Sequence, residues 1–304
     1  MPRSVAMRAT KVAIAANLFL LALKASATSL SDSLTIFSET LNSLADVVSS
    51  VVVLLCVRWA WMRPDEDHPF GHRRAEPIAG LVVAIFTGIL GFEVCKTAVV
   101  NLVQGRLPER IGLYPIVALC ITACLKAGLA VYFHRRGRFL GSPALRATAV
   151  DCRNDVFVAM QGLVAVVVAE LRLPLLDTVA ALLVGIYILY SGHRIGMENI
   201  DYLMGRSPGA GLLDRIRTAA GDVPGVVSVG DVKGHYVGTF VHVELTARVD
   251  GDLSTIDSHD VCESVREAVE AIDTVDRAFI HISPARRAGD APAEPADPEN
   301  APGT

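Results

Sequence analysis

The sequence predicts a polytopic α-helical membrane protein with six transmembrane helices, followed by a small α+β domain in the cytoplasm. Three observations support this fold class. Of the 304 residues, 52% are hydrophobic and 20% are charged, whereas an average soluble domain has about 45–50% apolar and about 25% charged residues. The apolar excess lies in the first two thirds of the chain, and the last third carries separate helix and strand patterns. A membrane domain followed by a soluble domain explains this division.

Six segments are long and apolar enough to cross a bilayer, which takes about 20 mostly apolar residues in a helix. The second and fifth contain several polar residues, so we expect them to have weak hydropathy. Together they form a predicted transmembrane domain over residues 1–206. The six segments are residues 9–30, 33–62, 77–103, 112–134, 143–171 and 175–200.

The N-terminus resembles a secretory signal, because basic residues precede an apolar run and residues 25–27 imitate a cleavage site. Lys24 beside that site and the further apolar segments favour a first transmembrane helix instead. Basic residues before the first helix and after the second, fourth and sixth predict that both termini are cytoplasmic, in the inner (cell) membrane. These residues are Arg3, Arg8, Lys11, Arg63, Arg73, Arg74, Arg135, Arg136, Arg138, Arg194 and Arg206.

Residues 207–284 show the order α-β-β-α-β. Two predicted strands are joined by a turn that contains Gly238, and the second strand alternates apolar and polar residues along its length. Ser254 or Thr255 is expected to cap the second helix. The elements are expected at residues 212–220, 226–235, 239–249, 255–272 and 277–283. Residues 285–304 are rich in Ala, Pro, Asp and Glu without an apolar period, which predicts a disordered tail.

The composition also excludes several functions. A net charge of −4 gives no reason to expect nucleic-acid binding. The six cysteines form no CxxC pair, so neither a disulfide framework nor a thiolate zinc site is indicated. The sequence contains no P-loop, no HExxH and no pairing of a nucleophile with a base, so we expect neither an enzyme nor an ATP-driven pump, and no bound cofactor.

Two polar pairs lie inside predicted transmembrane segments. Asn42 and Asp46 are four residues apart in the second, and Asp151 and Asp155 are four apart in the fifth. Residues at this spacing share one face of an α-helix, so each pair can present two oxygen ligands to one point. Ionisable groups at membrane depth are costly and usually face the protein interior. The two pairs therefore predict a four-ligand site for a divalent metal ion.

Structural polar contacts between helices are the alternative interpretation of these residues. A lone Asn in a membrane helix usually has such a role, but two pairs with three acidic members favour ligands. We expect structural roles for the other polar or charged residues of the apolar segments, including pairing of Glu93 with Lys96. That set is Lys24, Glu93, Lys96, Lys126, Arg153 and Cys152.

With these features, the sequence resembles the cation diffusion facilitator (CDF) family of divalent-metal/proton antiporters over residues 10–284. Six spans are followed by a small α-β-β-α-β domain similar to a copper chaperone, and the polar pairs fall in the second and fifth spans, where the family has its transport site. The stretch from Asp67 to Glu76 resembles the family's HxFGHxxxE motif.

The resemblance implies a homodimer that works by alternating access and exchanges metal for protons. It implies a second metal site in the loop, formed by Asp65, His68 and His72. It also implies a third site at the dimer interface of the cytoplasmic domain. Its ligands would be His235, His242, His259 and His281. Many members have an Asp soon after the last histidine, where this chain has Ser283, so a second cytoplasmic metal is not implied.

The transport-site pattern bears on the choice of metal. Zinc-transporting members commonly have His or Asp at the position of Asn42 and His at the position of Asp151, and manganese-exporting members resemble the set found here. An oxygen-only site suits Mn²⁺, while imidazole suits Zn²⁺. The sequence therefore predicts a Mn²⁺/H⁺ antiporter, with export of Fe²⁺, or of Zn²⁺ or Co²⁺, as alternatives. A metal-responsive dimer whose membrane part only anchors a scaffold or sensor is the alternative from another class.

Overall fold

The computed structural model describes the chain except residues 1, 30–33, 105–112, 172–173 and 286–304. It consists of two compact units. The first comprises Met1–Arg206 together with Val237–Thr239, and the second comprises Ser207–Tyr236 and the residues from Phe240 onward. The predicted disordered tail lies outside the described residues apart from Ala285. The loop segments between the first and second helices and between the third and fourth helices also lie outside the described residues.

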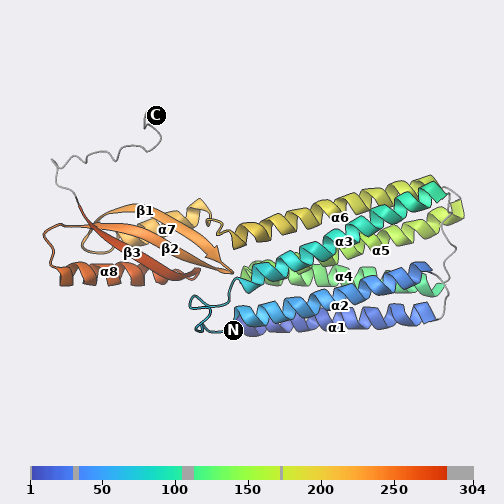
Figure 1. Cartoon of the computed structure of the whole chain (residues 1–304), viewed down its shortest axis with the longest axis horizontal. Coiled ribbons are helices and arrows are strands. Elements are labelled where there is room, and N and C mark those ends of the chain that lie inside the picture. The colour runs from blue at the N-terminus through green and yellow to red at the C-terminus, as the bar shows by residue number, and fades with distance from the viewer. Residues whose placement is uncertain (1, 30–33, 105–112, 172–173, 286–304) are drawn as a thin grey trace, which may run out of the picture. The chain divides into compact units, whose positions relative to one another are not determined.

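The first unit contains six long helices, as predicted (Figure 1). They are α1 (Pro2–Ser29), α2 (Leu34–Ala60), α3 (Ala75–Gln104), α4 (Leu113–Leu140), α5 (Pro143–Leu171) and α6 (Pro174–Leu203). Among the described residues, five of these helices contain a stretch long and apolar enough to cross a membrane, and α5 does not. The expectation of weak hydropathy is correct for α5, which carries four charged residues between Arg146 and Asp155. It is wrong for α2, which is more apolar than α1.

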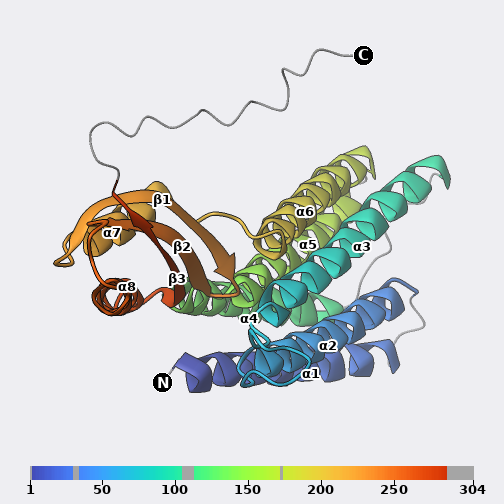
Figure 2. The same cartoon turned by 60° about the vertical axis from the view of Figure 1, so that its left-hand side comes forward.

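The six helices pack mainly in three pairs, α1 with α2, α4 with α5, and α3 with α6 (Figure 2). Glycines allow the close approach of α3 and α6. A Cβ atom added to Gly91 would lie 2.9 Å from the backbone nitrogen of Leu189, and one added to Gly185 would lie 3.1 Å from that of Cys95. Small residues at helix contacts are the usual means by which membrane helices approach each other.

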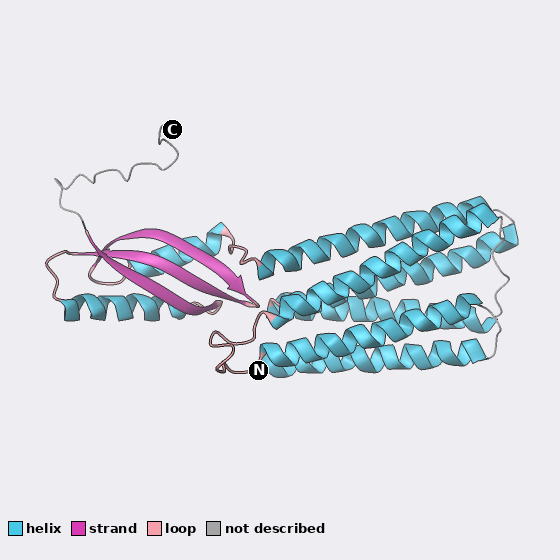
Figure 3. Ribbon diagram, in the orientation of Figure 1, coloured by secondary structure: helices cyan, strands magenta, loops and turns pink. Residues whose placement is uncertain are grey.

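The second unit is a three-stranded sheet with two helices (Figure 3). Its elements are α7 (Ala210–Gly221), β1 (Val226–Val237), β2 (Phe240–Val249), α8 (Thr255–Glu270) and β3 (Val275–Pro284). The sheet order is β1-β2-β3, and β3 runs parallel to β2. The predicted α-β-β-α-β order is confirmed. Ser254 is the cap of α8, because its side chain accepts a hydrogen bond from Asp257 N at 3.1 Å.

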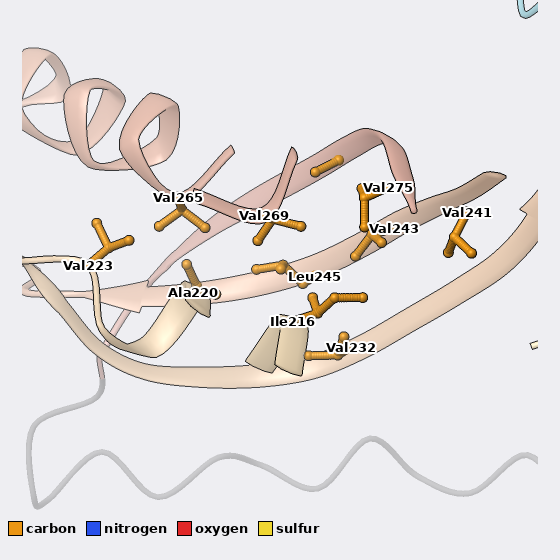
Figure 4. Close-up of a cluster of buried hydrophobic side chains, with 12 residues drawn as sticks. Ile216, Ala220, Val223, Val232, Val241, Val243, Leu245, Val265, Val269 and Val275 are labelled. Carbon is orange, nitrogen blue, oxygen red and sulfur yellow. The ribbon is translucent and has the colours of Figure 1, made fainter. Parts of the chain in front are cut away.

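The core of this unit lies between one face of the sheet and the two helices (Figure 4). Val241, Val243 and Leu245 alternate along β2 and are buried, in contact with Ile216 of α7 and Val265 of α8. The alternation repeats every second residue, as a strand requires. The opposite face of β2 carries His242, Glu244 and the other polar residues of the strand.

Candidate metal centre

Three carboxylates from two helices meet inside the first unit. Asp46 belongs to α2, and Asp151 and Asp155 lie one turn apart on α5. One ligand atom from each lies within 4.8 Å of the others, which is close enough for one ion to contact all three. Asp155 is buried, and the other two are partly buried. The structure therefore brings together the three acidic residues that the helical spacing predicted as ligands.

Lys126 lies in the middle of this cluster, although we expected it to have a purely structural role. Its Nζ atom donates hydrogen bonds to Asp46 Oδ2 at 2.9 Å and to Asp155 Oδ2 at 2.5 Å. The side chain comes from α4 and is 1% exposed. The sequence signal was a lysine in the middle of an apolar segment, but it did not show which helices would pack against that lysine.

Other polar residues hold the ligand helices in place, and the sequence did not single them out. Asn17 of α1 donates from Nδ2 to Ser50 Oγ at 2.7 Å and to the backbone carbonyl of Asp46 at 3.2 Å. Ser50 Oγ also donates to that carbonyl, at 2.8 Å. Thr87 of α3 donates to Asp151 Oδ1 at 2.9 Å. These bonds fix the position of α2 at Asp46 and the direction of the Asp151 side chain.

Two cavities flank the carboxylates along α1. The first is lined by Thr10, Asn17, Ser49, Thr148 and Asp151, among others. The second is lined by Lys24, Asn42, Asp46, Thr122 and Asp155, among others. Asn42 thus lies at the wall of the second cavity with two of the acidic residues. Asp151 lines the first cavity and Asn42 the second, and Lys126, which also lines the second, bonds to Asp46 and Asp155.

The remaining charged residues of the helices agree in part with their predicted roles. Lys96 donates to both oxygens of Glu93 at 3.0 Å, the pairing that their spacing predicts. Arg153 is exposed and lies over the ring of Tyr187, 5.7 Å from its centroid. Lys24 is buried at the second cavity. Cys152 packs in an apolar cluster that includes Phe133.

A second cluster lies in the loop between α2 and α3. Asp65, His68 and His72 each offer a ligand atom within 4.8 Å of the others. Asp65 Oδ2 is 3.2 Å from His72 Nε2, and the two imidazole rings are 4.4 Å apart. The backbone N–H of His68 donates to Asp65 Oδ1 at 2.7 Å and holds the pKa of that carboxyl below its usual value. The three residues named as a loop site are therefore neighbours in the structure.

The four histidines of the second unit do not meet within one chain. His235 and His242, on β1 and β2, have ring centroids 5.7 Å apart. His281 pairs with Thr246 in the β2–β3 register, four residues along β2 from His242. His259 is exposed on α8, which covers the other face of the sheet. His242 is buried, and this burial lowers its pKa, while Asp276 at 3.5 Å opposes the shift.

Comparisons with known proteins find related families for both units of the chain. Residues 10–204 match the family described as the cation efflux transmembrane domain, and residues 208–285 match the cytoplasmic domain of cation efflux proteins. The chain is 30% identical to an uncharacterized transporter of Methanocaldococcus jannaschii, over 82% of this chain and 88% of that protein. It is 30% identical to the manganese efflux system protein MneS of Bacillus subtilis (90% and 93%). It is 29% identical to the cation-efflux pump FieF of Cronobacter sakazakii (90% and 92%).

Proposed function

The chain belongs to the cation efflux family, the cation diffusion facilitators, and on this premise we propose that it exports Mn²⁺ from the cytoplasm in exchange for protons. Membership makes it a multi-pass membrane protein and a cation efflux transporter. The choice of metal, the exchange for protons, the location in the inner membrane with cytoplasmic termini, and the homodimer are parts of the proposal.

The oxygen-only cluster of Asp46, Asp151 and Asp155, with Asn42 beside it, is the observation that carries the choice of metal. Among the described residues, no histidine or cysteine offers a ligand atom to this cluster. Carboxylate and carbonyl oxygens suit Mn²⁺, whereas imidazole and thiolate favour Zn²⁺ and Cu⁺. The similarity to a manganese efflux protein supports the same choice. Fe²⁺ is the next candidate, ahead of Zn²⁺ and Co²⁺.

Exchange for protons follows from the electrostatics of the empty site. Carboxylates at this separation repel one another when ionised, and burial adds to the cost. Protons that bind when the metal leaves remove part of this repulsion, and an arriving metal ion displaces them. Metal binding from one side of the membrane is then linked to proton binding from the other.

The two histidine regions fit accessory metal sites. Asp65, His68 and His72 are neighbours in the loop, as a ligand set requires. His235, His242 and His281 lie on the face of the sheet that the helices leave uncovered, where a second copy of the chain can supply the missing ligands. Metal binding there would stabilise the dimer, because a ligand favours the form that binds it.

Transport by purified full-length protein in liposomes tests this proposal. Flux of Mn²⁺, Fe²⁺, Zn²⁺ and Co²⁺ is measured with and without a pH gradient, for the wild type, Asp155→Ala and the control Asp177→Ala. Asp177 is an acid of α6 that binds Gln161, outside the cluster. We expect Mn²⁺ flux that a pH gradient drives and that only Asp155→Ala abolishes.

Each other outcome contradicts a separate part of the proposal. Zinc flux without manganese flux would overturn the choice of metal. Uphill export by correctly inserted Asp155→Ala would exclude the cluster as the transport site. A wild-type protein that binds metal without moving it would favour the membrane-anchored scaffold or sensor.

A further inference from the structure

The ammonium group of Lys126 lies where a transported metal ion would bind. Its Nζ atom bridges Asp46 of α2 and Asp155 of α5, at 2.9 and 2.5 Å. These are two of the three carboxylates whose ligand atoms come within 4.8 Å of one another. A divalent ion that contacts all three would lie against the ammonium group. The chain therefore carries a positive charge of its own in the site.

The ammonium and a metal ion exclude one another in this arrangement. An Oδ2 lone pair that accepts a hydrogen bond from Nζ is not available to a metal. Two cations at contact distance also repel, and the repulsion is strong where burial keeps water away. Lys126 is 1% exposed and Asp155 is 6% exposed, so water screens these two charges only weakly. Binding of the metal therefore requires that Nζ leave at least one of the two carboxylates.

We infer that Lys126 is a tethered competitor of the transported ion, which occupies the empty site and withdraws when a divalent metal binds. The inference rests on the proposed function, because it assigns a role at the same site. The second cavity adjoins Lys126 and is lined in part by Asn42 and Thr122. It provides space and polar partners for the displaced ammonium group.

This competition also selects ions by charge. A monovalent cation that displaces the ammonium only replaces one positive charge by another, and it gains little. A divalent ion places more positive charge among the three carboxylates and gains a larger attraction. Lys126 is therefore a specificity-determining residue against the abundant monovalent cations. It also balances part of the negative charge when no metal is bound. This lowers the free-energy cost of the conformational change by which the metal-free transporter returns to face the cytoplasm.

Binding of Mn²⁺ alone to purified full-length protein in detergent tests the inference. The variants are Lys126→Met, which keeps the length of the side chain without its charge, Lys126→Arg, and the control Lys96→Met. Binding that Asp155→Ala removes is assigned to the carboxylate cluster, because that variant leaves the histidine regions intact. We expect Lys126→Met to raise this affinity on the order of tenfold or more, with no rise in Lys126→Arg or Lys96→Met.

Amine labelling of the wild type provides a second measurement if Lys126→Met does not fold. Acetylation of Lys126, relative to Lys96 in the same sample, should rise when Mn²⁺ is added, because the ammonium is released from at least one of its two ion pairs. An unchanged or lower affinity in folded Lys126→Met, or unchanged or reduced labelling of Lys126, would overturn the inference. If Asp155→Ala binds Mn²⁺ as well as the wild type, the proposed function fails instead.

Discussion

Thr87 on α3 donates a hydrogen bond of 2.9 Å to Oδ1 of Asp151 on α5. Thr87 is fully buried, and its helix supplies no ligand to the cluster. The bond restricts the rotation of the Asp151 side chain and so sets which of its oxygens is available to an ion. Neighbours that orient a ligand in this way contribute to metal affinity although they do not touch the ion.

Thr87→Val should therefore weaken metal binding without unfolding the protein. The loss of one hydrogen bond is worth about 0.5–1.5 kcal/mol, which corresponds to a decrease in Mn²⁺ affinity of about two- to tenfold. Titration calorimetry on purified protein measures the effect. Thr148→Val is a matched control, since Thr148 lines the same cavity as Asp151 but donates to its own helix at Ala144. Equal affinities in both variants would contradict the role of Thr87.

Asn42→His should shift the preference from Mn²⁺ towards Zn²⁺. Asn42 lines the second cavity with Asp46 and Asp155, so the substitution brings an imidazole to a site that otherwise offers oxygen. Imidazole favours Zn²⁺, and we expect the ratio of Zn²⁺ to Mn²⁺ flux in liposomes to rise by about tenfold, equivalent to about 1.4 kcal/mol. Asn42→Gln, which keeps an amide oxygen as a possible ligand, should leave the ratio closer to that of the wild type.

Gly91→Leu should destabilise the membrane unit. The added side chain would meet the backbone of α6 at Leu189 and Gly185, and overpacking of this kind typically costs about 1–3 kcal/mol. Gly128→Leu is the matched control, because a Cβ atom at that position meets nothing within 4 Å. Thermal melting in detergent should show a lower transition temperature for Gly91→Leu but not for Gly128→Leu. A comparable loss in both variants would mean that the close α3–α6 contact at Gly91 does not set the effect.

The cytoplasmic domain should lose stability as the pH falls below about 6.5, the usual pKa of histidine. Burial lowers the pKa of His242, so the unfolded chain takes up a proton at a pH where the folded domain does not. The unfolded state then binds more protons, and the free energy of unfolding decreases with falling pH. Denaturant unfolding of residues 207–285, which have their own core, measures this dependence. His242→Gln should flatten it, whereas His259→Gln, at an exposed residue, should not.

The sequence predicted the helices well because their apolar runs and the membrane thickness are both local properties. The ends of two helices and the hydropathy of α2 were predicted less accurately, and each difference has a physical reason. The first helix begins at Pro2 and the fourth ends at Leu140, several residues beyond the apolar runs, since a helix continues past the bilayer when its polar ends can contact water. The weak hydropathy expected of α2 was wrong because its polar residues, among them Asn42, Asp46 and Arg58, are outweighed by the apolar residues around them.

The acidic ligands of the candidate site could be predicted because each pair shares one helix face, and because two pairs of matching spacing suggested a common ion. The spacing of Asp151 and Asp155 shows that both lie on one face, and that is a property of the helix alone. The approach of Lys126 from α4 and of Thr87 from α3 depends on which helices are neighbours, and a single sequence does not contain that information directly. The same lack of information affects the histidines of the second unit. The sequence did not show that His259 lies on the other side of the sheet from His242.

The pairing of the helices has a mechanical consequence for the site. Asn42 and Asp46 belong to the α1–α2 pair, while Asp151, Asp155 and Lys126 belong to the α4–α5 pair, and the two pairs meet mainly where α1 packs against α4. A small slide of one pair along the other would leave each pair's internal packing unchanged and would still alter the distance from Asp46 to Asp155. An ion held by both pairs would therefore fix the distance between α2 and α5 at the cluster.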